Sequence, residues 1–533
     1  MSLIFLFEKY IIIFICVKEA GRSLILYSKI ISGAALGIEG MLISVESDIG
    51  AGLPGFNLVG YLSSSVKESA DRVRTALKNI GYSIPSRRIT VNLSPADVRK
   101  DGASFDLAIA TSILISMGIF SVSDEFNNKL GSTLFLGELG LDGSVLPISA
   151  VLPIVDHASK NGIETFVLPR QNCKEASFVD DIRIIPVDSL SDVVEMIYRE
   201  EWTEEYIKED VGVEYDIQGS VDMRDIRGQE TMKRGVMVAV AGFHNILLTG
   251  AAGAGKSMIA KCIPDIMPPL SYDECMELTK IYSVAGMLKG REGLMKRRPF
   301  RSPHSSISAV ALLGGGAIPK PGEISLSSSG VLFLDEFPEF RRESIEALRQ
   351  PMEEKTVTIS RLKASYTFPA KFMLVSARNN CPCGYYPDRK KCRCTYGEIY
   401  HYQNKISHPI MDRIDIRLDV SPVSHQDLFE SEPGISSKEA RDRIIIARER
   451  QEHRYRDEVF KYNCEVPQGK IGDYMKVGAK EEKLLRDIYE KTEMSTRGYF
   501  RLIRLARTIA DINDREDINC QDIEEALFYR NEQ

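Results

Sequence analysis

Residues 245–257 read NILLTGAAGAGKS, and this stretch decides the fold class of the central part of the chain. Residues 245–249 form a short apolar run of strand type, and residues 258–263 follow the glycines with helical spacing. Between them, residues 250–257 match the pattern G-x-x-x-x-G-K-S in its required context of strand, loop and helix. The sequence therefore predicts an α/β core built around a phosphate-binding loop.

The chemistry of this loop predicts a site for ATP and Mg²⁺. Glycines let backbone N–H groups close around phosphate oxygens, and the helix N-terminus favours negative charge. Lys256 is expected to reach the β- and γ-phosphates, and the Ser257 hydroxyl is expected to ligate Mg²⁺. The predicted nucleotide-binding residues are Gly250, Ala251, Ala252, Gly253, Ala254, Gly255, Lys256 and Ser257, with Asp335 from a later strand. The alternative is a glycine-rich turn with a solvated lysine.

Two further apolar runs end in residues suited to the same chemistry. Residues 331–334 (VLFL) precede Asp335, a predicted Mg²⁺ ligand, and Glu336, which we expect to orient and polarise water. Residues 371–376 (KFMLVS) end near Asn379, whose amide is suited to hold the attacking water or the γ-phosphate. A solvated strand end and an asparagine that caps a turn are the alternatives.

Four of the ten cysteines lie within 14 residues, at Cys381, Cys383, Cys392 and Cys394. Two C-x-C pairs across a short loop supply the four thiolates of a tetrahedral, structural Zn²⁺ site. A redox dithiol and unligated cysteines remain alternatives. A secreted disulfide framework would spread and pair its cysteines, so the pattern favours a reducing, cytoplasmic location.

Composition sets outer limits on the function. The chain has 533 residues, which suggests about three or four domains. Hydrophobic residues make up 44% and charged residues 27%, which excludes a mainly disordered or collagenous chain. The net charge of −7 excludes a protein coated in basic charge, so any nucleic-acid contact must come from local basic elements.

The pattern along the chain predicts five segments. Residues 1–26 form an apolar leader or a mis-annotated start, with translation from Leu24 or Leu26; a poor secretory signal is the alternative, and no stretch is long enough to span a membrane. Residues 27–200 are expected to be an α/β or α+β domain, with strands near 42–45, 88–93, 134–137 and 165–168 and a helix over 65–80. An acidic linker (201–222), the nucleotide-binding core (223–425) and a helical lid (426–533) follow, with a capping box at Ser436 and Glu439.

Longer motifs in the core carry a family resemblance. They are RPFRSPH at 298–304, GGG at 314–316, PKPGE at 319–323, GVLFLDE at 330–336 and residues 379–384. The chain closely resembles the magnesium-chelatase-like AAA+ ATPases, specifically the bacterial ComM/YifB group. This resemblance implies an ATP-driven homo-hexameric ring, associated with DNA branch migration when transforming DNA is integrated.

The resemblance also assigns arginines to roles between subunits and in the lid. Arg413, within 412–415 (DRID), matches the arginine finger that reaches the γ-phosphate of the neighbouring subunit. Arg497, within 496–498 (TRG), matches the sensor-2 segment that opens a lid helix. Arg501, Arg504 and Arg507 follow at helical spacing, so we expect one basic face, with a solvated helix surface as the alternative.

Two inserts are expected to contact DNA. Residues 314–329 resemble the hairpin of this clade, with Lys320 near its tip, and residues 356–368 predict a second hairpin with Arg361 and Lys363 near its turn. In related helicase rings such hairpins line the pore, where single basic residues bind phosphates. Exposed hairpin charges without a ligand are the alternative.

The N-terminal half resembles a Lon-protease-like domain through residues 52–60 and 91–96. Residues 100–104 (KDGAS) resemble the Lon segment around the nucleophilic serine, which would be Ser104. The position of the lysine base holds Leu152, so the resemblance implies a fold retained without peptidase chemistry. The predicted fold is α/β overall: an N-terminal Lon-protease-like α+β domain, a P-loop AAA+ α/β core with hairpin inserts, and a C-terminal helical lid.

Together these features predict an ATP-hydrolysing ring motor that acts on DNA, with Glu336, Lys256, Asn379, Arg413 and Arg497 as its catalytic residues. Three rival functions remain. They are a motor subunit for metal insertion into a porphyrin, an ATP-dependent protease and a non-motor scaffold.

Overall fold

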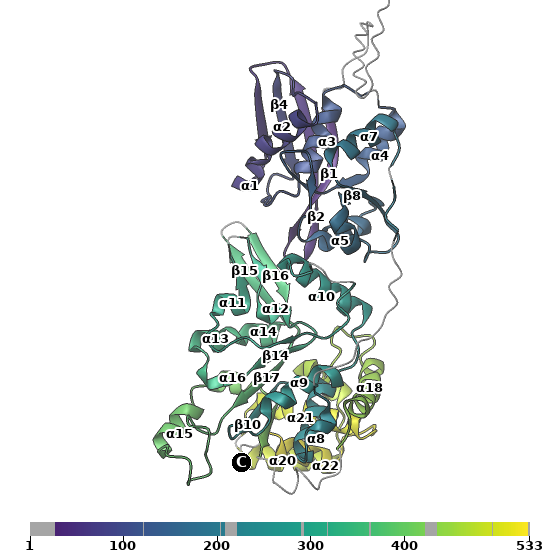
Figure 1. The fold of residues 1–533 in the computed structure, drawn as a ribbon. Coiled ribbons are helices and arrows are strands. Elements are labelled where there is room, and N and C mark those ends of the chain that lie inside the picture. The colour runs from purple at the N-terminus through teal and green to yellow at the C-terminus, as the bar shows by residue number, and fades with distance from the viewer. Residues whose placement is uncertain are drawn as a thin grey trace, which may run out of the picture.

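The computed structural model of the protein describes residues 27–207 (except 121 and 203), 221–288 and 293–530 (except 317, 362–363, 422–433 and 493). The predictions for residues 1–26, for most of the linker, for the boundary between core and lid, and for Lys363 lie outside the described residues. Within the described part, no helix combines the length and apolar character that crossing a membrane requires. Figure 1 shows an N-terminal unit at one end of the molecule and the nucleotide-binding core with its lid at the other.

The N-terminal unit is built on a seven-stranded mixed sheet. Its order is β3-β4-β2-β1-β5-β8-β9, with antiparallel pairs at β4-β2-β1 and parallel pairs elsewhere. The strands are β1 (Tyr27–Leu36), β2 (Glu39–Gly50), β3 (Gly55–Val59), β4 (Arg88–Ser94), β5 (Thr133–Phe135), β8 (Thr165–Pro169) and β9 (Arg183–Val187); β6 (Glu138–Leu139) and β7 (Val145–Leu146) form a separate small hairpin. The four strands predicted from the sequence are all present.

Helices cover both faces of this sheet. They are α1 (Ser64–Lys67), α2 (Ser69–Asn79), α3 (Asp106–Ser116), α4 (Asp124–Gly131), α5 (Val151–Lys160), α6 (Arg170–Ala176) and α7 (Leu190–Arg199). One buried apolar cluster joins the sheet to α2, α3, α4 and α7, and another joins it to α5 and α6. Every residue of α3 is buried, and its apolar residues lie on all sides of the helix, as is typical of a helix inside a core. The single helix expected over 65–80 is instead two helices, α1 and α2, with Glu68 as the residue between them.

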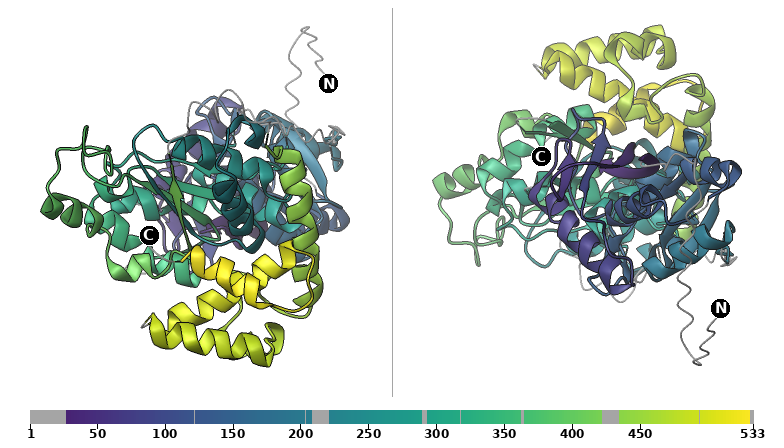
Figure 2. Two further views of the ribbon diagram at one scale, coloured as in Figure 1. Left: turned by 90° about the horizontal axis from the view of Figure 1, so that it is seen from below. Right: turned by 90° about the horizontal axis from the view of Figure 1, so that it is seen from above.

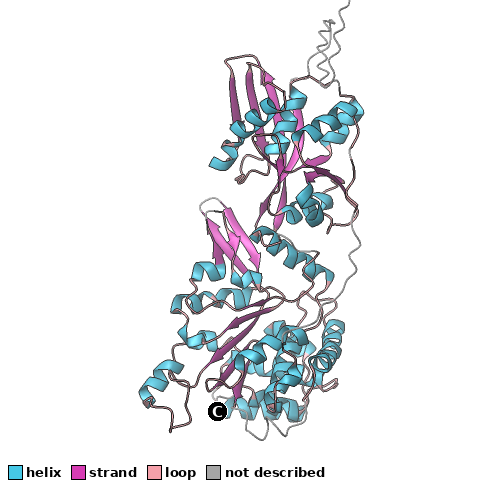
Figure 3. Cartoon of the chain, in the orientation of Figure 1, coloured by secondary structure: helices cyan, strands magenta, loops and turns pink. Residues whose placement is uncertain are grey.

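The core is a five-stranded parallel sheet in the order β11-β14-β17-β10-β18. Its strands are β11 (Phe300–Arg301), β14 (Val331–Leu334), β17 (Met373–Arg378), β10 (Ile246–Gly250) and β18 (Ile416–Val420). Its helices are α8 (Glu230–Gly242), α9 (Lys256–Ile266), α10 (Tyr272–Ala285), α11 (Ala309–Leu313), α12 (Glu323–Leu326), α13 (Arg342–Ala347), α14 (Arg349–Glu354), α15 (Tyr396–Gln403) and α16 (His408–Met411). Figure 3 shows helices on both sides of this sheet. The carboxyl ends of its parallel strands meet at one edge, where ligands bind in such sheets.

The lid is helical and shares a core with the sheet. Its helices are α18 (Ser437–Arg454), α19 (Ile471–Tyr474), α20 (Ala479–Lys491), α21 (Thr496–Ile512) and α22 (Cys520–Phe528), drawn in yellow-green and yellow in Figure 2. The predicted capping box is confirmed, since the Ser436 hydroxyl accepts from Glu439 N–H and the Glu439 carboxylate accepts from Ser436 N–H. Ile444 and Leu502 belong to the same buried cluster as Ile246 of β10, so the lid is packed onto the core.

Two hairpins project from the core. The first, β12 (Gly314–Gly315) with β13 (Lys320–Pro321), is short and leads into α12. The second, β15 (Thr356–Arg361) with β16 (Ala364–Pro369), confirms the hairpin predicted over 356–368. The backbone of Thr367 lies close to the turn at Gly37, so this second hairpin reaches the N-terminal unit (Figure 1).

Helix α10 is the other contact between the two parts. Lys280 Nζ lies 2.6 Å from Asp156 Oδ2 of α5, and Ser283 Oγ donates to Glu175 Oε1 of α6 at 2.5 Å. Burial raises the pKa of Glu175, although Ser283 and the backbone N–H of Leu152 oppose that effect. Polar pairs therefore join α10 to α5 and α6, and Ile38 of the N-terminal unit adds an apolar contact to the cluster around Leu278 of α10.

A substitution tests the packing of the N-terminal sheet. A methyl group added at Gly40 in β2 would lie 2.4 Å from the Pro153 carbonyl oxygen and 2.5 Å from His157 Cβ of α5. Because backbone cannot yield as a flexible side chain does, we expect Gly40→Ala to lower the free energy of unfolding by about 1–3 kcal/mol. Gly131→Ala is the control, since nothing lies within 4 Å of its added methyl group. Equal thermal melting midpoints for the two variants would contradict this packing.

Candidate nucleotide site and cysteine knuckle

The predicted phosphate loop joins β10 to α9. Gly253 and Gly255 both have positive φ, 79° and 91°, and neither has an atom within 4 Å of the place where a Cβ would sit. The loop therefore leaves open space at the N-terminus of an 11-residue helix. Backbone N–H groups around such a space, with the helix dipole behind them, fit a polyphosphate.

Lys256 crosses this loop and is nearly buried. Its Nζ donates to the carbonyls of Gly250 and Ala251, both at 2.8 Å, and to Asn379 Oδ1 at 3.0 Å. Burial lowers the pKa of Lys256, while the charges of Asp335 and Glu336 act in the opposite direction. The structure thus brings Asn379, predicted from the end of a different strand, into direct contact with the loop lysine.

Asp335 and Glu336, which follow strand β14, also lie beside the phosphate loop. Ser257 Oγ donates to Asp335 Oδ2 at 2.8 Å, so the two predicted Mg²⁺ ligands already lie side by side. A hydroxyl and a carboxylate are hard oxygen donors of the kind that Mg²⁺ prefers. Glu336 follows with a positive φ of 50° and an exposed side chain, so its carboxylate is open to solvent beside the loop. The residues present fit ATP with Mg²⁺.

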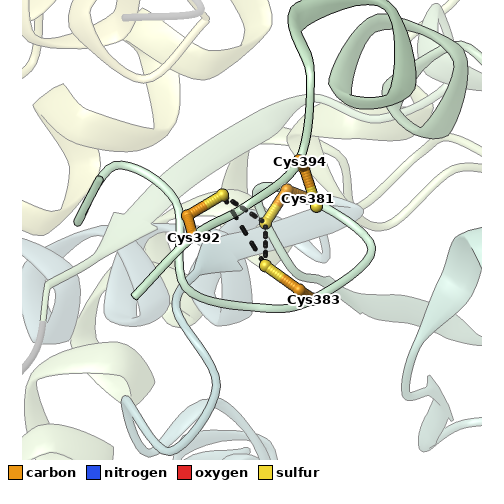
Figure 4. Close-up of side chains that lie close together, drawn as sticks. All are labelled: Cys381, Cys383, Cys392 and Cys394. Atoms are coloured by element: carbon orange, nitrogen blue, oxygen red, sulfur yellow. Dashed lines mark hydrogen bonds between the residues drawn. The ribbon is translucent and has the colours of Figure 1, made fainter. Parts of the chain in front are cut away.

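The four cysteines form a knuckle, residues 381–394, that follows Asn379. Figure 4 shows their side chains close together, and the four sulfurs lie within 4.8 Å of one another. Cys381 and Cys383 Sγ are 3.3 Å apart, and Cys392 Sγ is 3.7 and 3.6 Å from them. A tetrahedral zinc with Zn–S bonds of about 2.3 Å separates its sulfurs by about 3.8 Å, whereas a disulfide needs about 2.05 Å. The spacing fits a shared metal ion and excludes a formed disulfide.

One thiol of the knuckle is set up as a thiolate. The backbone N–H of Tyr385 bonds to Cys383, and this contact, with help from the neighbouring thiols, lowers the pKa of Cys383 to about 6. Thiolate is the form that ligates metal. Arg389 lies over the rings of Tyr386 and Tyr396, at 4.8 and 4.5 Å from their centroids, and bonds to the Cys394 carbonyl, so it braces the knuckle from outside.

Arg413 and Arg497 lie together at the opposite edge of the sheet from the phosphate loop. Arg413 precedes β18, and its carbonyl accepts from Asn245 at the start of β10, about 16 Å of strand away from Gly250. Glu353 of α14 joins the two arginines, at 2.6 Å from Arg413 Nη2 and 3.3 Å from Arg497 Nη2. Burial disfavours the charge of Glu353, but the arginines outweigh it and lower its pKa.

The other three arginines of α21 do not form the expected basic face. Arg501 pairs with Asp415 at 3.7 Å, Arg504 donates to the Val466 carbonyl, and Arg507 is buried against Asp511 at 3.0 Å. Both the shared basic face and the solvated helix surface were wrong for Arg504 and Arg507, because α18 and the loops beside it pack over this side of the helix. Arg507 is buried and Arg504 is half-buried, and both are bonded within the lid, whereas Arg501 is paired with a carboxylate of the core.

The predicted DNA contacts lie on the hairpins. Arg361 is exposed, and its Nη2 donates to the Gly316 carbonyl at 2.9 Å, so the tips of the two hairpins touch. Lys320 is exposed and opens strand β13, where it pairs with Gly315 directly beside the turn, so it lies near the hairpin tip as predicted. The structure therefore gathers these two basic side chains at one end of the core.

The Lon-like segment has no lysine at the position of the base. Leu152 is fully buried in the core of the N-terminal unit, while Ser104 is half-buried in the turn before α3. Lys100 is also buried, its Nζ bonds to the Pro95 carbonyl, and burial lowers its pKa.

Sequence reasoning missed Glu353 and Gly384. Glu353 sits in a run of charged residues (MEEK) with no local pattern that marks it. Gly384 lies in the motif at 379–384 and was given no role of its own, yet its carbonyl accepts from Ala252 N–H of the phosphate loop at 3.0 Å. Its place directly after the first cysteine pair was the one available signal.

A lysine substitution tests the site directly. Lys256→Ala removes the cation at the mouth of the loop and the support of Asn379, so we expect fluorescent ATP-analogue binding to fall at least about 100-fold. Lys261→Ala, an exposed lysine of the same helix, is the matched control and should bind as the wild type does. Equal affinities of the two variants would show that the loop does not hold the phosphates.

Comparisons with known proteins identify the family. Residues 222–428 match the family described as magnesium chelatase, subunit ChlI, residues 434–530 match its C-terminal part, and residues 45–172 match subunit ChlI of Mg-chelatase. The chain is 37% identical over 504 residues to the competence protein ComM of Haemophilus influenzae, covering 94% of this chain and 96% of ComM. It is 37% identical over 500 residues to YifB of Escherichia coli, covering 93% of this chain and 96% of YifB.

The N-terminal unit has a second likeness. The Lon protease of Mycolicibacterium smegmatis is 29% identical over 172 residues, covering 30% of this chain and 21% of that protease. With a P-loop core, a helical lid and a Lon-like N-terminal unit all in place, the chain belongs to the magnesium-chelatase-like ComM/YifB family of AAA+-type ATPases.

Proposed function

We propose that this AAA+-type ATPase is a homo-hexameric ring motor that acts on DNA, of the kind that drives branch migration or unwinding in recombination and transformation. The observation that carries the proposal is that three groups of functional residues lie at three separate positions on the core. The phosphate loop lies at one edge of the sheet, paired arginines lie at the opposite edge, and exposed basic hairpins project from the core.

Within one subunit, the site residues have separate roles. Lys256 and the loop N–H groups bind the phosphates, while Ser257 and Asp335 would ligate Mg²⁺, which offsets phosphate charge when it is bound. Glu336 orients the attacking water, and Asn379 positions Lys256 and the terminal phosphate. Phosphoryl transfer of this kind depends on positioning and charge more than on covalent chemistry.

The ring follows from the two edges of the sheet. Arg413 and Arg497 cannot serve the phosphate loop of their own subunit, because the length of β10 separates them from it. A head-to-tail ring brings this edge of one subunit to the loop of the next, and such heterologous contacts close into rings. Arg413 then acts as the finger on the neighbour's γ-phosphate, with Arg497 beside it.

The DNA role is supported by charge at the hairpins. Lys320 and Arg361 are exposed at one end of the core although the whole chain has a net charge of −7. Single cations on a pore hairpin bind backbone phosphates without sequence preference, as a translocating motor requires. The name of the Haemophilus relative, competence protein, agrees with a role in DNA uptake and integration.

Three finer points belong to the proposal. The knuckle holds a structural Zn²⁺, and the protein acts in the cytoplasm. Peptidase activity is disfavoured by Leu152, which is a core residue. Metal insertion into a porphyrin is the main rival, and the near-full-length match to ComM and YifB, fused Lon-like unit included, favours the DNA motor.

Mixed rings test the arginine finger. Lys256→Ala and Arg413→Ala proteins should each be nearly inactive alone. When mixed, they should recover ATPase activity, because an intact loop from one variant meets an intact Arg413 from the other. Lys256→Ala mixed with Glu336→Gln is the control and should not recover, since both changes damage the same half of the site. Absence of recovery in the first mixture, under conditions where rings form, would contradict a finger that acts between subunits.

Removal of the hairpin charges tests the DNA role. We expect single-stranded, forked and four-way-junction DNA to stimulate ATP hydrolysis, and Glu336→Gln to abolish it. Lys320→Ala/Arg361→Ala should lose most of the stimulation and flatten the salt dependence of DNA binding, while keeping the basal rate. Lys476→Ala/Lys480→Ala removes the same charge from the exposed surface of the lid and should keep the stimulation. Hydrolysis indifferent to every DNA would leave the ATPase and remove the DNA motor.

A further inference from the structure

The cysteine knuckle begins directly against the phosphate loop. Gly384, in the turn after Cys383, accepts a hydrogen bond from the backbone N–H of Ala252 at 3.0 Å. It is buried and has a positive φ of 81°, and a Cβ placed there would lie 3.0 Å from Ala252 Cβ and 3.8 Å from Asn379 Nδ2. Only glycine fits such a close approach without strain.

Residues 379–384 touch the loop at both ends. At the start of this segment, Asn379 Oδ1 accepts from Lys256, and at its end Gly384 accepts from Ala252. Cys381 lies between them with no exposed surface, and its carbonyl accepts from Gly384 N–H at 3.0 Å. A ligand cysteine is therefore the centre of a short bridge whose two ends hold the nucleotide loop.

Several weak contacts also hold this bridge in place. Within the knuckle, Asn380 Nδ2 donates to the Tyr386 carbonyl at 3.2 Å, and Tyr386 N–H bonds to Cys381 Sγ at 3.4 Å. Helix α15 contributes two contacts: Gln403 Nε2 donates to the Asn380 carbonyl at 3.2 Å, and Asn379 N–H bonds to the Tyr402 hydroxyl. The buried apolar cluster of the knuckle consists of Cys381, Cys392 and Ile399. Tyr386 and Cys394, both partly buried, pack against it. A cluster of this size stabilises a loop only weakly by hydrophobic burial, so four thiolates on one metal would add a strong restraint.

The phosphate loop has no proline at this point, and its internal restraints are the bonds that the Ala251 carbonyl accepts from Lys256 Nζ and Ala254 N–H. Ala251 and Ala252 have no ring to fix φ, and Gly253 follows them. A hydrogen bond from outside the loop therefore restricts the conformation of Ala252 more than it would in a loop stiffened by proline.

We propose that the metal-loaded knuckle is a clamp on the phosphate loop: Zn²⁺ on Cys381, Cys383, Cys392 and Cys394 holds Gly384 against Ala252 and Asn379 against Lys256, so that nucleotide affinity and turnover depend on the metal. This inference rests on the proposed ATP and zinc sites and goes beyond them by coupling the two. Gly384 is a positioning residue, because it acts on the phosphates only through the loop.

The first arm of the test keeps the metal and loosens the clamp. Gly384→Ala leaves all four thiols in place, so zinc content, measured by release to a colorimetric chelator, should stay at about one per chain. Affinity for a fluorescent ADP analogue and the basal ATPase rate, both without DNA, should fall about tenfold, since small displacements at a site cost that much or more. Gly397→Ala is the matched control: it lies at the start of α15, has no positive φ and meets nothing within 4 Å.

The second arm removes the metal and leaves Gly384 intact. Cys383→Ser/Cys394→Ser should lose zinc and lose nucleotide affinity to the same extent as Gly384→Ala, with an unchanged main melting transition. Wild type stripped by a chelator should lose affinity and regain it with added Zn²⁺, which the double variant cannot do.

The outcomes separate this inference from the proposed function. The clamp is overturned if wild type takes up no metal, if zinc-free protein binds nucleotide as tightly as the loaded protein, or if Gly384→Ala binds like Gly397→Ala. Because every measurement is made without DNA, failure of the DNA motor does not affect it. Nucleotide affinity decides the question independently of turnover.

Discussion

The hydrogen bond from Lys256 to Asn379 is the contact on which the nucleotide site depends. It joins the ends of β10 and β17, which are neighbours in the parallel sheet. A buried ammonium is costly unless its donors are used, and here the three donors meet two loop carbonyls and one amide. The register of the two strands therefore sets the geometry of the loop, and an insertion in either strand would separate its parts.

The parts of this site that were predictable are those whose signal is local. Residues 250–257 are contiguous in the sequence. The apolar run at 331–334 predicts a strand, and this places Asp335 and Glu336 at the end of that strand. The contact of Ser257 with Asp335 follows because parallel strands bring their carboxyl ends to one edge. The cysteine spacing also predicted a common site from a local signal, because a loop of eight residues keeps the two C-x-C pairs close together in space.

The parts that were not predictable depend on what packs against an element. Helical spacing correctly places Arg497, Arg501 and Arg504 along one side of α21, but it does not say that other segments of the lid cover much of that side. Glu353 is one glutamate in a charged run, and its role as the partner of Arg413 and Arg497 arises only when three distant segments meet. Likewise, the place of Gly384 after the first cysteine pair does not by itself indicate that its carbonyl contacts the phosphate loop.

The second hairpin lies between two nucleotide sites along the chain, and this explains how hydrolysis could move it in the proposed ring. Glu353 lies in the last turn of α14, three residues before β15 begins, and β16 leads through β17 to Asn379. One root of the hairpin thus ends at the carboxylate that holds Arg413 and Arg497, and the other ends at the lysine of the subunit's own loop. In the proposed ring, arginines that turn to a neighbour's phosphate would leave Glu353 without these two partners, and the change would reach the hairpin through the covalent chain. This path needs no long-range relay through the core. The hairpin and the two residues that contact the nucleotide-site groups, Glu353 and Asn379, lie on one continuous stretch of chain.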